Sequence, residues 1–162
     1  MGGLTRPASL SAYHILDEFD CGIPAMNDWL RRRALPNESS GASRSFVVCQ
    51  GAMVVGFYAL ATGAVRRENA PGMIRRAMPE PIPVMVLGRL AVDLNWQKQG
   101  IGTGLLKDAL LRTLTVSKQA GIRALVVHAL SEDAKHFYLL HGFKESPLQP
   151  MTLMLSLAAW KL

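Results

Sequence analysis

The sequence has few cysteines, and they form no recognisable pattern. Only two of the 162 residues are cysteines, Cys21 and Cys49; they lie far apart and neither belongs to a Cys-x-x-Cys motif. Disulfide frameworks and cysteine-based metal sites depend on such spacings, so neither is expected here. The apolar run 46–49 around the second cysteine favours two buried free thiols over a disulfide.

Metal-ligand spacing and long apolar runs are also missing. The four histidines, at positions 14, 128, 136 and 141, form no His-x-x-x-His or His-Glu-x-x-His pattern. No uninterrupted apolar stretch approaches the ~20 residues of a membrane span, and the N-terminus lacks a basic region followed by an apolar core. We therefore expect no metal and no membrane association, and a cytoplasmic location.

The remaining composition is that of an ordinary globular domain. Hydrophobic residues make up 49% of the chain and charged residues 19%. A chain of this length buries enough apolar surface to fold without a disulfide or a structural metal. We expect one domain over residues 1–162.

Positive charge is concentrated in one region. Between residues 31 and 89 nine arginines stand against three glutamates, a net charge of +6, and the rest of the chain sums to zero. The guanidinium fork suits phosphate, so a polyanionic partner such as nucleic acid is one interpretation and a merely solubilising surface is the other. The nine are Arg31, Arg32, Arg33, Arg44, Arg66, Arg67, Arg75, Arg76 and Arg89.

The N-terminal half predicts a helix followed by a hairpin. Residues 25–35 have helical apolar spacing, and Pro36 is expected to end the helix before a loop over residues 36–41. Residues 45–50 and 53–62 are rich in Val, Phe and Tyr and predict two antiparallel strands.

Residues 63–83 are expected to form a long, mostly irregular loop. The segment holds four arginines and four prolines, which leave room for only a turn or two of helix around residues 72–78. Long loops inside small domains commonly carry function, so we expect this one beside the active site.

The best organised part of the sequence predicts strand, glycine-rich turn, helix and strand. Residues 84–92 are almost entirely apolar, as in a strand covered on both faces, and residues 97–104 open a helix. Residues 124–130 form the next strand, so the unit favours parallel pairing through a crossover. The expected buried face of the helix is Leu105, Leu106, Ala109, Leu110, Thr113 and Leu114.

A glycine-rich turn at a helix start gathers free backbone N–H groups and the positive end of the helix dipole, which together bind phosphate. Gly100, Gly102 and Gly104 alternate, so the turn is neither a Walker A loop nor a complete Gly-x-Gly-x-x-Gly motif. Taken alone, it is equally compatible with a tight turn that binds no ligand.

The context of this turn resembles the GNAT superfamily of acetyl-CoA-dependent N-acetyltransferases. Gln97-Lys98-Gln99-Gly100-Ile101-Gly102 matches the family's Arg/Gln-x-x-Gly-x-Gly/Ala turn, and the segments 134–138 and 142–143 match its tyrosine helix and the following Gly-Phe. The resemblance implies an α/β GNAT fold, with a central mixed, mostly antiparallel sheet, a parallel crossover at the cofactor site and flanking helices.

The resemblance also assigns residues to acetyl-CoA. Tyr138 would be the general acid toward the departing thiolate, on a helix capped by Ser131; residues Phe137, Leu140 and His141 would form the buried side of that helix and leave Tyr138 facing a cleft. The expected cofactor-binding residues are Leu90, Ala91, Val92, Gln97, Lys98, Gln99, Gly100, Ile101, Gly102, Thr103, Gly104 and Ala134.

A narrower resemblance is to the TacT-like GNAT toxins of bacterial type II toxin–antitoxin systems. It rests on the arginine-bearing helix near Trp29, on residues 61–63 and on residues 78–93. Members acetylate the free α-amino group on aminoacyl-tRNA, which blocks translation. The resemblance further implies a ribbon–helix–helix antitoxin, contact with operator DNA only through the antitoxin complex, and a homodimer.

Two chemical arguments agree with this resemblance. An α-amino group, with a pKa of ~7.7–8.0, is partly neutral near pH 7 and needs little help from a base, and strand 84–92 contains no carboxylate, only Asp93 at its end. The arginine block suits the phosphates of an RNA acceptor arm. We expect direct transfer without a cysteine nucleophile. The expected tRNA contacts are Arg31, Arg33, Arg75, Arg76 and Arg89.

Two other functions stay open at this point. One is acetylation of a small amine or a protein N-terminus, which would make the arginines surface charge or, for Arg89, part of a structural ion pair. The other is a non-enzymatic corepressor that only holds an antitoxin; the glycine turn together with Tyr138 argues against it.

Overall fold

Residues 3–159 are described by a computed structural model, in which the chain forms two units. The first unit comprises residues 3–61 and 88–109, and the second comprises residues 62–87 and 110–159. Residues 160–162, for which the sequence predicts no role, lie outside the described part. Two strands and one helix run from one unit into the other along the chain: β3 (Met53–Val65), β4 (Ile82–Val92) and α4 (Ile101–Ser117).

The first unit is built on an antiparallel set of strands. Val47 of β2 is paired with Ala8 of β1 and with Phe57 of β3, so the predicted hairpin is confirmed. Besides its parts of β3, β4 and α4, the unit contains β1 (Ala8–Ser9), α1 (Pro24–Arg32), α2 (Ala34–Ser40), β2 (Arg44–Gln50) and the 3-10 helix η2 (Leu94–Trp96).

The predicted loop over residues 36–41 is wrong, because these residues belong largely to α2. The first helix ends at Arg32, before Pro36, and the chain turns at Arg33 into a second helix. Pro36 lies in the first turn of α2, where a missing N–H costs no helical hydrogen bond. The helix ends instead at Gly41, whose φ of +80° is the left-handed conformation of a helix C-terminus.

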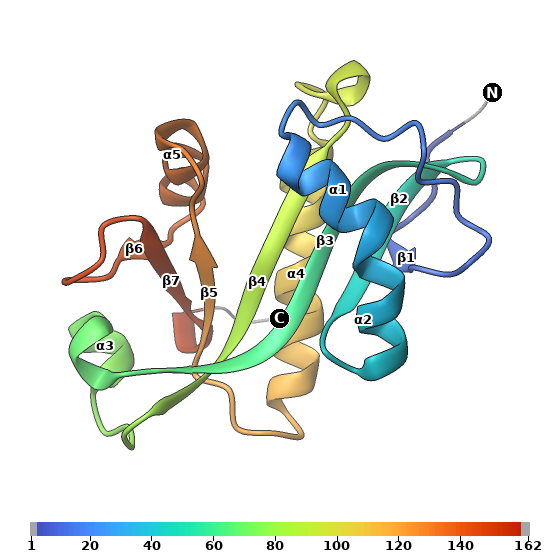
Figure 1. The fold of residues 1–162 in the computed structure, drawn as a ribbon. Coiled ribbons are helices and arrows are strands. Elements are labelled where there is room, and N and C mark those ends of the chain that lie inside the picture. Colours follow the sequence, from blue (N-terminus) through green and yellow to red (C-terminus); the bar gives the residue numbers. More distant parts are fainter. Residues whose placement is uncertain (1–2, 160–162) are drawn as a thin grey trace. The chain divides into compact units, whose positions relative to one another are not determined.

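The two faces of β3 bury different partners in the first unit. Phe57 lies against α1, with its ring stacked on Trp29 and in edge contact with Phe19. Gly56 points to the other face, where Ile101 and Leu105 of α4 approach closely. This alternation follows from the two-residue period of a strand. Figure 1 shows α1 and α2 in front of β2 and β3, with α4 behind.

The second unit holds the predicted parallel crossover. Residues Val84–Leu87 of β4 pair in parallel with Ala124–Val127 of β5, and β7 lies antiparallel to both β5 and β6. Strand β3 extends to Val65, beyond the predicted end at residue 62. The remaining elements are the 3-10 helix η1 (Arg67–Asn69), α3 (Gly72–Arg75), β5 (Ala124–His128), α5 (Glu132–Leu140), β6 (Lys144–Glu145), β7 (Thr152–Ser156) and the 3-10 helix η3 (Leu157–Ala159).

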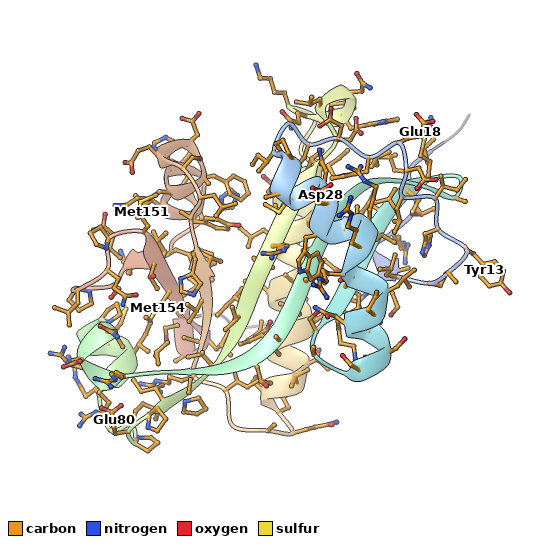
Figure 2. The ribbon with its side chains drawn as sticks, viewed as in Figure 1. Tyr13, Glu18, Asp28, Glu80, Met151 and Met154 are labelled. Atoms are coloured by element: carbon orange, nitrogen blue, oxygen red, sulfur yellow. The ribbon has the colours of Figure 1, made fainter. Side chains whose placement is uncertain are left out.

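The arginine-bearing loop, residues 63–83, contributes side chains to the core of the second unit. Ile74 of α3 and Ile82 of β4 are fully buried in one apolar cluster with Val84, Val126 and Met154. In Figure 2, Met154 lies on β7 next to α3. Within residues 3–159, no helix is both long and apolar enough to cross a membrane.

Replacing Gly63 tests how tightly β3 packs in the second unit. A Cβ at this position would lie 2.8 Å from Cγ2 of Val86, a side chain that is stiff because it is β-branched. Gly63→Ala is expected to lower the free energy of unfolding by about 1–3 kcal/mol, measured by urea denaturation. Gly121→Ala is the control, since its Cβ would enter open space. Equal unfolding energies for the two variants would contradict the packing described.

Candidate active site

The glycine-rich turn reverses the chain between β4 and α4 with two left-handed residues. Lys98 has a φ of +63° and Gly100 a φ of +85°, and α4 then begins at Ile101. The N–H of Gly104 donates to the carbonyl of Gly100 at 3.0 Å, which starts the helical hydrogen-bond pattern. The turn is therefore a helix start of the predicted kind.

Backbone donors are left free at this helix start. In the described chain the N–H groups of residues 99–103 have no hydrogen-bond partner, and residues 97–100 are exposed. The dipole of a 17-residue helix adds partial positive charge at the same place. At Gly104 a Cβ would meet no atom within 4 Å, so no packing inside the chain requires glycine there. These features fit a pyrophosphate approached by backbone N–H groups.

Gln97 stabilises the turn by hydrogen bonds to two backbone carbonyls of the first unit. Its Nε2 donates to the carbonyl of Val92 at 2.9 Å and to that of Cys21 at 3.4 Å. The side chain thus connects the turn to the end of β4. The family resemblance implies only a cofactor contact for Gln97 and not this structural role. Leu90 and Val92 are half-buried, and Ala91 is buried with its carbonyl toward Gly56.

Asp93, the carboxylate at the end of β4, is buried and already occupied. One carboxylate oxygen accepts the N–H of Asp20 at 3.0 Å and the other accepts the N–H of Asn95 at 2.9 Å. The side chain therefore caps η2 and fixes the 20–22 segment beside it. With a hydrogen bond to each oxygen, Asp93 is a structural acceptor.

Gly56 is a site-positioning residue that the sequence analysis missed. A Cβ there would lie 3.1 Å from Leu105, 3.2 Å from Ile101 and 3.5 Å from the carbonyl of Ala91. The absence of a side chain lets the first turn of α4 approach β3 and β4. A glycine inside an otherwise apolar strand signals such an approach, so the pattern was available in the sequence.

Both cysteines are buried free thiols, as predicted. Burial raises the pKa of Cys21 and of Cys49 above that of an ordinary thiol. Since the thiolate is the nucleophilic form, neither residue is suited to covalent catalysis.

Tyr138 lies on the buried side of α5, so the predicted faces of this helix are wrong. Only 8% of Tyr138 is exposed, whereas Leu140 is 72% exposed. Phe137 and His141 are half-buried. In the structure Tyr138, rather than Leu140, faces the interior.

The end of α5 explains this orientation. Gly142, with a φ of +92°, donates its N–H to the carbonyl of Leu139 at 3.1 Å, and Phe143 donates to that of Tyr138 at 3.2 Å. This is a Schellman motif, which brings the residue after the glycine back over the last helical turn. The rings of Phe143 and Tyr138 are 5.3 Å apart in an edge contact. The Gly-Phe pair thus holds the Tyr138 ring in place.

The hydroxyl of Tyr138 is protonated under all ordinary conditions. Burial raises the pKa of Tyr138 to about 12, and no hydrogen bond or charge from the described residues offsets this. Such a group keeps its proton across the neutral range. At the other end of α5, Ser131 is the predicted cap: its Oγ accepts the N–H of Ala134 at 3.1 Å. The N–H of Ala134 is therefore engaged within the helix.

The arginines of the first unit differ in how freely they can bind a ligand. Arg31 donates to the carbonyl of Phe19 at 2.9 Å and lies 3.5 Å from Asp28. Arg89 lies over the ring of Trp29, with Cζ 4.6 Å from the centroid, and burial lowers the pKa of its guanidinium. Its Nε is buried without a partner among the described residues, and no acidic group pairs with it. Arg33, between α1 and α2, is exposed.

Two of the predicted tRNA contacts, Arg75 and Arg76, lie in the arginine-bearing loop of the second unit. Arg75 is exposed and donates to the carbonyl of Ala70 at 3.4 Å. Arg76 is exposed too, and its guanidinium makes no hydrogen bond or ion pair with any residue in 3–159. A pocket of about 390 Å³ in the same loop is lined by Arg66, Glu68, Glu80 and Pro81.

The described part of the chain contains no group of three or more His, Cys, Asp or Glu side chains placed to hold a metal ion. The first unit offers free backbone N–H groups and exposed arginines, and the second unit offers a buried tyrosine and exposed arginines.

Comparison with known protein families gives a match to the acetyltransferase (GNAT) domain over residues 41–145. A tRNA-acetylating toxin from Mycobacterium tuberculosis (strain ATCC 25618 / H37Rv) is 46% identical over 155 residues, which cover 96% of this chain and 93% of the relative.

Solved structures of the AtaT toxin are similar over almost the whole chain. AtaT complexed with acetyl-methionyl-tRNAfMet has a TM-score of 0.90 and 29% identity, covering 97% of this chain and 96% of that one. A tyrosine-to-phenylalanine mutant bound to the C-terminus of the antitoxin AtaR and to acetyl-CoA has a TM-score of 0.83 and 29% identity, covering 96% and 94%. The AtaT–AtaR complex bound to DNA has a TM-score of 0.79 and 28% identity, covering 96% of each chain.

The family match spans more than half of the sequence, the relative from Mycobacterium tuberculosis covers nearly all of it, and the glycine turn and the tyrosine helix are both present. The chain belongs to the GNAT family of acetyltransferases.

Proposed function

We propose that the chain is the toxin of a type II toxin–antitoxin system, which acetylates the α-amino group of an aminoacyl-tRNA and so blocks translation. The observation that carries the proposal is the 46% identity to a tRNA-acetylating toxin over nearly the full length of both proteins. The likeness to AtaT complexed with acetyl-methionyl-tRNAfMet supports the same substrate class.

Acetyl-CoA is the acetyl donor in this proposal, and when bound it supplies the acetyl group as an activated thioester. The free N–H groups of residues 99–103 and the open space at Gly104 would hold its pyrophosphate. The backbone of residues 90–92 would lie along its pantetheine arm. Gln97 and Asp93 keep these two segments in place through the hydrogen bonds described above.

In this proposal the chain supplies a proton donor, Tyr138, and no dedicated general base. Tyr138 holds its proton well above neutral pH and can deliver it to a departing sulfur. Asp93 is buried and accepts a backbone N–H with each carboxylate oxygen, so its role in this proposal is structural. An α-amino group needs no strong base, because part of it is neutral near pH 7.

The proposal includes partners and a location. A ribbon–helix–helix antitoxin would bind the toxin, and operator DNA would be contacted only through that complex, in line with the AtaT–AtaR structures. A substrate of charged tRNA would locate the protein in the cytoplasm. The homodimer expected from the resemblance stays a prediction.

The decisive experiment supplies purified protein with radiolabelled acetyl-CoA and a pool of charged tRNA. We expect label on charged tRNA and none on uncharged tRNA, amines or peptides. Tyr138→Phe is expected to reduce kcat by about 10²–10⁴-fold, the usual contribution of a positioned acid. Tyr13→Phe is the matched control, because Tyr13 is 90% exposed and projects from its loop in Figure 2.

Two outcomes would count against the proposal. Label on amines or peptides but not on tRNA would leave a GNAT enzyme with another substrate. Growth arrest that survives Tyr138→Phe unchanged would favour a non-enzymatic corepressor.

The pH dependence tests the assignment of acid and base. With the pKa of Tyr138 raised to about 12, the acid stays protonated across the neutral range, so its titration does not limit the rate there. We expect kcat/KM to rise with pH up to the pKa of the substrate amine, ~7.7–8.0, and then to level off without a falling limb below pH 9. Initial rates between pH 6 and 9 measure this. A fall in rate between pH 7 and 9 would show that the acid titrates below the ordinary tyrosine pKa of ~10 and would contradict the raised value.

Salt dependence tests the arginine contacts. Arg76→Ala is expected to weaken binding of charged tRNA and to reduce the slope of log K against log salt by about 1, as for one lost phosphate contact. Lys118→Ala removes the same charge from the same unit at an exposed position after α4 and serves as control. Affinities are compared by filter binding at several salt concentrations. Identical slopes for the two variants would exclude Arg76 as a phosphate contact.

A further inference from the structure

Arg123, a residue with no assigned role, is bonded to the arginine-bearing loop. It precedes β5, and its Nε donates to the carbonyl of Ile74 at 3.0 Å. Its Nη2 donates to the carbonyl of Met73 at 3.1 Å and contacts that of Arg76 at 3.5 Å. The backbone N–H of Arg123 donates to the carbonyl of Pro83 at 2.9 Å, at the far end of the same loop.

The carbonyls that Arg123 binds are those at the C-terminus of α3. This helix has only four residues, so its last carbonyls have no partner further along the helix, and an isolated helix of this length does not persist. A guanidinium at the C-terminus satisfies these carbonyls and interacts favourably with the helix dipole.

The residue after this end of the helix is strained. Ala77 has a φ of +60°, a left-handed conformation that is unfavourable for a residue with a Cβ. The strained turn persists because both sides of it are fixed. Ile74 is fully buried before it, and Met78 packs against the same apolar cluster after it. Arg123 fixes the short segment between these anchors.

Resting on the proposed function, we propose that Arg123 is a positioning residue for tRNA binding: it locks the C-terminus of α3 so that Arg75 and Arg76 are presented to the RNA in one fixed arrangement. Both arginines are exposed, and their backbones lie within the segment that Arg123 binds. A preordered arginine pair loses less conformational entropy on binding phosphate than a mobile one does.

This role differs from a direct contact between Arg123 and RNA. Two of the three guanidinium nitrogens are engaged by carbonyls of the chain, and the side chain is half-buried. The contacts also use the planar fork, since Nε and Nη2 reach neighbouring carbonyls together. A lysine keeps the charge but lacks this geometry. Arg123→Lys therefore separates geometry from charge.

The test compares Arg123→Lys, Arg76→Ala and the double variant with the wild type. We expect Arg123→Lys to raise the KM for charged tRNA by about tenfold, with kcat and the KM for acetyl-CoA unchanged. In the Arg76→Ala background the same substitution is expected to have a smaller effect, because one of the two presented arginines is gone. Additive effects would indicate that Arg123 acts independently of the loop. A wild-type KM in Arg123→Lys would refute the positioning role.

A second measurement does not depend on RNA. Trypsin cleaves after arginine only where the backbone can open, so Arg123→Lys is expected to speed cleavage after Arg75 and Arg76 several-fold relative to Lys118→Ala. Unchanged cleavage would contradict the proposal that Arg123 fixes the C-terminus of α3, even if tRNA binding fell. If the wild type shows no tRNA acetylation at all, the proposed function fails. Faster cleavage in Arg123→Lys would still show that Arg123 fixes the C-terminus of α3.

Discussion

In the first unit, the glycine-rich turn proposed to bind the cofactor depends on the close approach between the start of α4 and β3 at Gly56. With no Cβ at this position, Ile101 and Leu105 pack directly against the strand, and the helix start is held at the end of β4. Gln97 and Asp93 then secure the turn by bonding to backbone groups of β4 and of residues 20–22. The free N–H groups of the turn are aligned because each surrounding segment is fixed.

The second unit uses backbone hydrogen bonds for the same purpose. The Schellman motif at Gly142 places Phe143 against Tyr138 and so fixes the orientation of the buried tyrosine. Arg123 completes the end of α3 in a comparable way. In both cases a short helix gains a defined end, and the residue with a proposed role in function lies within one turn of that end.

Local patterns were sufficient for much of the fold. The hairpin, the parallel crossover, the glycine turn and the Ser131 cap each depend on neighbouring residues, and the structure has all four. The errors arose where a residue was judged without its partners. The expectation that Pro36 ends a helix is wrong because the first turn of a helix tolerates proline. The expectation that Tyr138 faces away from the buried side of α5 is wrong because the contact with Phe143 holds its ring inward. The carbonyl partners of Arg123 are distant in sequence and leave no local pattern.

Several arginines in this chain donate hydrogen bonds to neutral acceptors. Arg31 and Arg75 donate to the carbonyls of Phe19 and Ala70, and Arg123 donates only to carbonyls. A carbonyl fixes the geometry of a guanidinium without cancelling its charge, whereas a carboxylate would cancel it. Three arginines of the block are paired with a carboxylate, at Asp28, Glu38 and Glu68. The field that extends into solvent therefore comes mainly from the other arginines of the block. Ionic strength can then weaken long-range attraction of a polyanion while the contacts that order the protein itself stay largely insensitive to screening.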